Sequence, residues 1–172
     1  WEYWLYILNG FRWHNPVRRL SLCFSVADLH SQHHYKTSQL IERCKNILAI
    51  TVGVQKKIPL SIIITQCDRI PGFAAFFGQS SAEQLKSPLS CNISGSSESM
   101  LMNFAAGFDQ IIFSVKEKMR CHKNLNQDKD GRYLINLLED QLYQVKSSLY
   151  CMLDQINPTR PLNLDRVALT GG

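Results

Sequence analysis

Apolar residues along the chain recur in two patterns, one with the period of a helix and one in short uninterrupted runs. The helical pattern predicts long helices near residues 2–11, 35–52, 98–120 and 132–156. The short runs predict parallel strands near residues 18–26, 58–65 and 165–169. The run that ends at Ile64 implies burial on both faces, which is typical of a strand inside a parallel sheet. The sequence therefore predicts an α/β fold in which helices connect and cover parallel strands.

Two segments break both patterns. Residues 79–98 are rich in serine and contain Pro88 and Gly95, so we expect a surface loop there. Residues 121–131 form a polar connection between the last two predicted helices. The length of 172 residues predicts one domain. Because the chain begins at Trp1, inside a predicted helix, we expect it to be part of a longer protein.

Composition narrows the class of protein. The chain is 45% hydrophobic and 19% charged, and it has no apolar stretch of the roughly 20 residues that a membrane span needs. The net charge of +5 could face nucleic acid or an anionic membrane surface, but no aromatic residues alternate with the basic ones. Solvated lysines are the favoured interpretation, and we expect no nucleic-acid partner. The six cysteines have no C-x-x-C spacing, which favours free thiols in a reducing compartment and no metal site.

A polar tetrad, Thr65 to Asp68, follows the most apolar predicted strand. Ligands of α/β proteins bind at the carboxyl ends of parallel strands, so this position favours a binding role. An aspartate at residue 68 could accept two hydrogen bonds from a guanine base, which adenine cannot offer. The alternative is that Asp68 caps the short helix expected to start near Pro71–Gly72.

Two other candidate sites have a plainer explanation. The histidines at 30, 33 and 34 lack a carboxylate or cysteine at ligand spacing, so a solvated helix start is favoured over a metal site. Cys67 has no histidine beside it in sequence, so we interpret it as a buried thiol at a strand end and not as a nucleophile.

The residues around the tetrad resemble a known family. Thr65-Gln66-Cys67-Asp68 resembles the N/T-K-x-D guanine-reading motif of P-loop GTPases, and Leu169-Thr170-Gly171 stands where the final base-contacting loop would be. The wider stretches SVADL, IPLSIIITQCDRIPGFAAFFGQSSAEQ and NLDRVALTGG resemble the cytoplasmic GTPase-like domain of the IcmF/TssM family. That family comprises large inner-membrane components of type VI and type IVB (Dot/Icm) secretion systems. The resemblance covers nearly the whole chain.

This resemblance implies an incomplete P-loop GTPase-like fold, with residues 1–172 as the C-terminal portion of the cytoplasmic domain. It implies that a base would be recognised by Thr65, Gln66, Asp68, Thr170 and Gly171. The family usually has lysine where this chain has Gln66, which brings no charge. The chain contains no G-x-x-x-x-G-K-[ST] sequence, so it has no phosphate clamp of its own. GTP or GDP could bind only with residues upstream, and no cofactor is expected in this segment.

The resulting hypothesis is a scaffold or regulatory domain, a pseudo-GTPase, on the cytoplasmic face of the inner membrane. The resemblance implies a membrane-anchored parent protein, a partner of the DotU/IcmH (TssL-like) type and a contribution to virulence. We favour the type IVB branch over the type VI branch because the tetrad is degenerate. The alternative is a nucleotide-binding GTPase domain whose phosphate-binding half lies outside this chain. Phosphoryl transfer by this segment alone is not expected.

Overall fold

The structure is a computed structural model and describes residues 19–30, 34–54, 59–78, 89–93, 99–121, 129–156 and 163–171. Its elements, in chain order, are β1 (Leu20–Ser25), α2 (Val26–His30), α3 (His34–Val54), β2 (Leu60–Thr65), the 3-10 turn η1 (Cys67–Arg69), α4 (Pro71–Phe77), β3 (Leu89–Asn92), α6 (Met100–Cys121), α7 (Lys129–Ile156) and β4 (Leu164–Leu169).

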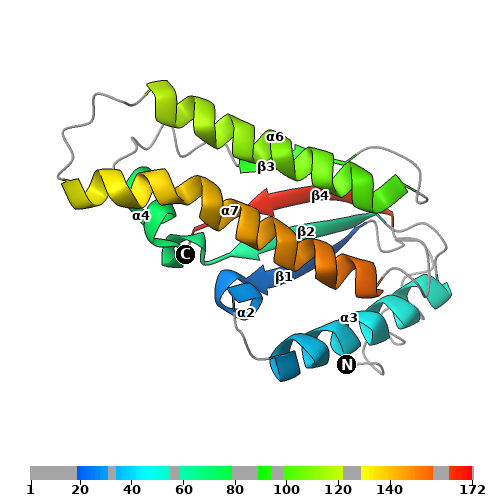
Figure 1. Ribbon diagram of the computed structural model, residues 1–172. Helices are drawn as coiled ribbons and strands as arrows, with labels where there is room; N and C mark the ends of the chain where they lie inside the picture. Colours follow the sequence, from blue (N-terminus) through cyan, green and yellow to red (C-terminus); the bar gives the residue numbers. More distant parts are fainter. Residues whose placement is uncertain are drawn as a thin grey trace.

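The described strands form one sheet with the order β1-β2-β4-β3 (Figure 1). β1, β2 and β4 run parallel, and Ile64 of β2 lies between Phe24 of β1 and Leu169 of β4. These are the three strands that the sequence predicts. β3 pairs antiparallel with β4. The fold is therefore α/β, with a mostly parallel sheet, as predicted.

The strand β3 corrects the prediction of a surface loop over residues 79–98. Residues 89–92 form the outer strand beside β4, and Leu89 and Cys91 are buried. The error arises because four residues are too few to give a detectable alternation, and backbone hydrogen bonds to a neighbouring strand decide such a segment.

The predicted helices near 35–52, 98–120 and 132–156 are confirmed as α3, α6 and α7. α3 and α7 are somewhat longer than expected, and α6 begins two residues later and ends one residue later than predicted. The predicted connection 121–131 is wrong at both ends, since Cys121 belongs to α6 and Lys129 begins α7. The predicted helix near 2–11 lies outside the described residues. In the part of the chain that the structure describes, no helix is long and apolar enough to cross a membrane.

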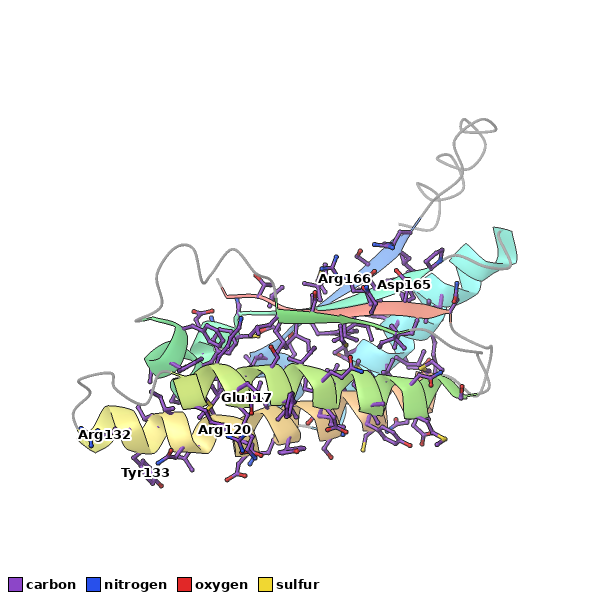
Figure 2. The ribbon with its side chains drawn as sticks, turned by 90° about the horizontal axis from the view of Figure 1, so that it is seen from above. Glu117, Arg120, Arg132, Tyr133, Asp165 and Arg166 are labelled. Atoms are coloured by element: carbon purple, nitrogen blue, oxygen red, sulfur yellow. The ribbon has the colours of Figure 1, made fainter. Side chains whose placement is uncertain are left out.

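The described helices gather on one side of the sheet, with α6 and α7 side by side (Figures 1 and 2). On that side β2 presents Leu60, Ile62 and Ile64, which are at most 2% exposed. The two long helices cover them with fully buried side chains, among them Phe104, Phe108, Leu138, Leu142 and Leu149. The main core thus lies between the sheet and the α6–α7 layer.

The prediction that β2 is buried on both faces is only partly right. On the face away from α6 and α7, Ser61 is buried, whereas Ile63 and Thr65 remain half-buried. The apolar run could not reveal this difference, because isoleucine suits either face of a sheet.

Candidate functional site

The tetrad lies at the carboxyl end of β2, next to the residues that follow β4. The Thr170 amide donates to the carbonyl of Ile64 at 2.8 Å, and the Cys67 amide donates to the carbonyl of Thr170 at 3.1 Å. The structure therefore brings the tetrad and the Thr170–Gly171 segment to the same edge of the sheet. This is the edge at which parallel α/β sheets bind ligands.

Gln66 leaves β2 in a left-handed backbone conformation, with φ of 59°. Its side-chain oxygen Oε1 accepts a hydrogen bond of 2.8 Å from the hydroxyl of Ser25, at the end of β1. Thr65 also reaches β1, because its hydroxyl donates to the carbonyl of Phe24 at 3.2 Å. Two members of the tetrad are thus engaged with the neighbouring strand. The Gln66 side chain thus links the carboxyl ends of β1 and β2.

Asp68 lies in the η1 turn and is exposed. The alternative that Asp68 is the cap residue of α4 is wrong, because Ile70 occupies that position and makes no side-chain hydrogen bond to the helix. Pro71 instead occupies the first turn, where a proline needs no hydrogen-bond partner. Gly171 is also exposed, and a β-carbon placed on it would meet no atom within 4 Å.

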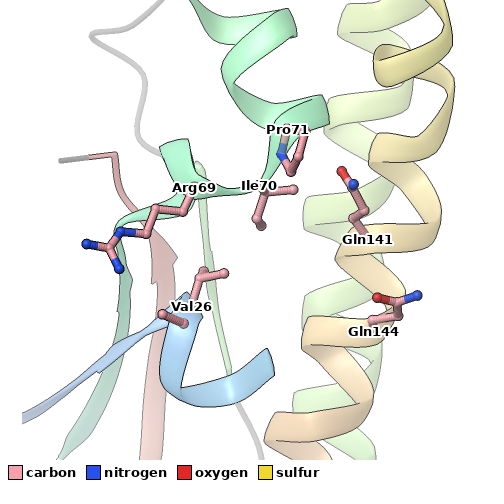
Figure 3. A pocket seen from close by; sticks show the side chains of 7 residues that line it. Val26, Arg69, Ile70, Pro71, Gln141 and Gln144 are labelled. Carbon is pink, nitrogen blue, oxygen red and sulfur yellow. The ribbon is translucent and has the colours of Figure 1, made fainter. Parts of the chain in front are cut away.

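A cavity of about 380 Å³ lies beside the tetrad, between α2, the η1–α4 corner and α7 (Figure 3). Its lining is an apolar floor with one guanidinium and two carboxamides: Val26, Ala27, Arg69, Ile70, Pro71, Gln141 and Gln144. None of the five residues predicted to recognise a base lines this cavity. The Gln141 side chain is partly used within the protein, since its Oε1 accepts the Gly72 amide at 3.2 Å.

Cys67 is fully buried, and burial raises its pKa to about 11. Its Sγ lies 3.5 Å from the carbonyl of Ile64, to which the thiol donates. A protonated thiol is a poor nucleophile, so the interpretation of Cys67 as a buried strand-end residue is confirmed. The side chains of the histidines at 30, 33 and 34 lie outside the described set. Within that set, no three histidine, cysteine, aspartate or glutamate side chains gather as metal ligands would.

Sequence reasoning missed a surface feature on α6 and α7, which we call the aromatic seam: Asp109, Phe113 and Lys116 on α6, with Glu139, Tyr143 and Lys146 on α7. Each helix carries an acid, an aromatic residue and a lysine at positions i, i+4 and i+7. The helices run antiparallel, so that Lys146 pairs with Asp109 and Lys116 with Glu139, both at 2.7 Å. The repeated spacing is present in the sequence, but the two sets of residues become one surface only because α6 and α7 pack side by side and antiparallel.

The two aromatic residues of the seam lie between these ion pairs and face solvent. The Phe113 residue is 62% exposed and Tyr143 is 46% exposed. The Lys146 ammonium also lies 5.9 Å from the centre of the Tyr143 ring, within the range of a cation–π contact. Exposed aromatic residues framed by neutralised charges are the kind of surface that protein partners bind.

In the comparison with protein families, the model of the IcmF-related N-terminal domain matches residues 1–164. Neither a curated protein nor a solved structure is similar to the chain. The family match spans nearly all of the 172 residues, including the tetrad and all the described elements up to the start of β4. The chain belongs to the IcmF-related family, whose members are secretion-system components associated with the inner membrane.

Proposed function

We propose that this domain is a scaffold of a secretion machine, on the cytoplasmic face of the inner membrane, and that it binds partner subunits through the aromatic seam. A membrane partner of the DotU/IcmH (TssL-like) type and the type IVB branch are the finer expectations. The observation that carries the proposal is the exposure of Phe113 and Tyr143 between two interhelical ion pairs.

The chemistry of the seam favours a protein partner. Its four charged side chains neutralise one another within the domain, so a partner does not have to compensate them. Burying the Phe113 and Tyr143 rings would supply apolar area without leaving a charge unpaired. A surface of this kind contributes affinity through a few aromatic contacts.

The contacts of the tetrad also favour a scaffold role over nucleotide binding. Gln66 is held by Ser25, and the Thr170 backbone closes the loop from the other side. The edge is therefore braced by contacts within the domain, and it lacks the lysine that would cover a purine. These contacts stabilise a junction of strands whether or not a ligand is present.

The experiment replaces Phe113 and Tyr143 by serine, together, in the full-length protein in its native cells. We expect loss of co-purification with the inner-membrane subunits of the machine and loss of secretion, at an unchanged protein level. The matched control is Tyr133→Ser, which removes a 64% exposed tyrosine from α7 outside the seam. Normal assembly and secretion in the double variant would contradict the proposal.

A second candidate function is nucleotide binding with residues upstream of this chain. It is favoured by the backbone hydrogen bonds that join Cys67 and Thr170 and so place the predicted base-reading residues at one edge. A titration of fluorescent GDP and ADP into the full cytoplasmic region tests it, with Asp68→Asn as the variant and Asp140→Asn as the control. GDP binding that is lost in Asp68→Asn alone supports this function, and absence of binding in every protein excludes it.

A further inference from the structure

The aromatic seam has an approximate two-fold symmetry of its own. Both helices carry the same order of residues, an acid, an aromatic residue and a lysine. Because the helices are antiparallel, a half-turn about an axis normal to the surface exchanges α6 and α7 approximately. The signs of the charges therefore alternate around the seam, with one pair at each end: Asp109 and Lys146 at one end, Lys116 and Glu139 at the other. No described element lies over this outer side of the two helices (Figures 1 and 2).

An alternating pattern of this kind is complementary to itself. A second copy can be placed face to face on the seam by a two-fold rotation about an axis parallel to the helices. The α6 helix of each copy then lies over the α7 helix of the other. Every acid comes to lie opposite a lysine of the other copy, Asp109 opposite Lys146 and Glu139 opposite Lys116, and the rings of the two copies face one another. Self-complementarity of this kind is what a two-fold interface requires.

The residues beyond the seam select this axis. An axis across the helices would satisfy the charges equally well, but the two ends of the layer differ. At one end, seven residues beyond the rings of the seam, lie Ala106 on α6 and Tyr150 on α7, both exposed, and Met102 beyond them is 74% exposed. The opposite end is polar, with Arg120 and Asn136 exposed. An axis parallel to the helices places apolar end on apolar end, whereas an axis across them would place it on the polar end.

We propose that the aromatic seam is the interface of a homodimer, in which α6 and α7 of two copies form a four-helix bundle. The inference rests on the proposed scaffold function and names the partner at the seam as a second copy of this chain. All adjacent helices of this bundle are antiparallel, as in up-down-up-down bundles. The 22 residues of α6 give a face roughly 33 Å long and two helices wide, or roughly 650 Å², close to the ~800 Å² that each partner buries in a standard interface.

Charge complementarity favours the second copy over other occupants. An apolar helix, from another protein or from elsewhere in this one, would gain only from the rings. It would remove water from four charged side chains and offer them no hydrogen bond in return, which costs free energy. A helix with charges of one sign would repel two of the four. A second copy supplies an opposite charge at each position and a ring for each ring.

The experiment reverses one ion pair of the seam. The double variant Asp109→Lys/Lys146→Glu keeps a pair between α6 and α7 with its direction exchanged. Two full-length copies with different tags are produced together in native cells, one with Ala106→Cys and the other with Tyr150→Cys, positions that face each other across the proposed axis. All copies also carry Cys151→Ser, which removes an exposed native thiol of α7. A short bis-maleimide reagent then joins the two tagged copies in native membranes.

We expect cross-linking when both copies have the native charges, and equally when both carry the double variant, because a reversed pair then meets a reversed pair. A mixture of one native and one double-variant copy places like charges opposite each other twice, so its cross-linking should fall about tenfold or more. The control places Ala106→Cys in both copies, where the axis keeps the two positions apart. Circular dichroism of the purified double variant confirms that its fold is kept.

Equal cross-linking in matched and mixed pairs would overturn the charge-matched interface. Loss of cross-linking between two double-variant copies would overturn the axis, since an axis across the helices sets the reversed pair against the unchanged one. Absence of cross-linking between native copies would overturn the homodimer. If the variant with Phe113 and Tyr143 replaced by serine still lost co-purification and secretion in that case, the seam would bind a different subunit and the scaffold function would stand. Normal assembly in that variant would remove the scaffold function as well.

Discussion

The hydroxyl of Ser25 donates a 2.8 Å hydrogen bond to Oε1 of Gln66, and so joins the carboxyl ends of β1 and β2 across 41 positions of sequence. The bond holds a non-glycine residue whose backbone is left-handed, a conformation that costs energy for a residue with a β-carbon. It places the tetrad against β1 and leaves Asp68 in the turn that follows. Gln66 thus serves as a structural brace at the position where the resemblance expects a lysine over a purine.

Removal of this brace should destabilise the fold. We expect Ser25→Ala and Gln66→Ala each to lower the free energy of unfolding by about 1 kcal/mol. The double variant should lose less than the sum, because both substitutions remove the same bond. Gln66→Gly should cost less than Gln66→Ala, since glycine relieves the left-handed backbone. Urea unfolding measures these values, with Gln144→Ala, an exposed glutamine on α7, as the control. Strictly additive losses would show that the two side chains do not interact.

Gly72 allows α4 to approach α7 closely. A β-carbon at this position would lie 2.5 Å from the Leu134 carbonyl oxygen and 2.9 Å from the β-carbon of Leu138. Gly72→Ala should therefore force the two helices apart and cost about 1–3 kcal/mol of stability. The matched control is Gly171→Ala, because a β-carbon there meets nothing within 4 Å. A thermal melt compares the two variants, and equal melting temperatures would mean that α4 is not held as closely as the structure places it.

The ion pair between Lys146 and Asp109 joins α6 to α7 at the aromatic seam. The Lys146 side chain is 19% exposed and that of Asp109 is 50% exposed, so the pair is partly shielded from water. We expect Lys146→Glu to reduce stability by about 0.5–1 kcal/mol. Adding Asp109→Lys should restore most of this loss by reversing the pair. Urea unfolding of the single and double variants checks the recovery, and a further loss in the double variant would argue against a direct pair.

The buried thiols predict a loss of stability at alkaline pH. Burial raises the pKa of Cys44 and that of Cys67 from 9.0 to about 11 in the folded state. The folded protein therefore holds these protons where the unfolded chain releases them, so stability is full below pH 9 and falls as the pH rises towards 11. We expect a loss on the order of 2 kcal/mol for each thiol across this range.

Unfolding curves at pH 8 and pH 10.5 measure this effect. In Cys67→Ala the fall between the two values should be smaller than in the unchanged protein, although the variant is less stable at both because it leaves a cavity. The exposed Cys151 provides the control, and Cys151→Ala should retain the whole alkaline loss. An identical fall in Cys67→Ala would show that the alkaline effect comes from other groups.

Local sequence patterns were sufficient to predict the elements with strong periodicity and the position of the tetrad after β2. The stripes of α6 and α7 and the run before Thr65 are local patterns, and burial of an apolar stripe is sufficient to predict a helix or a strand. The family could also be recognised from residues that are adjacent in the chain. The strand β3 could not be predicted from the sequence, because its four residues become a strand only through hydrogen bonds to β4.

Which side chains contact one another could be learned only from the packed structure. The Ser25–Gln66 bond and the aromatic seam each depend on residues that are far apart in sequence, and on which helix or strand lies beside which. Ile63 is half-buried whereas its neighbour Ile62 is fully buried, although the two residues are identical and differ only in the face of the sheet on which they lie. Local pattern fixes what each segment becomes, whereas contacts between segments are set by the free energy of the whole packed chain, which no local pattern contains.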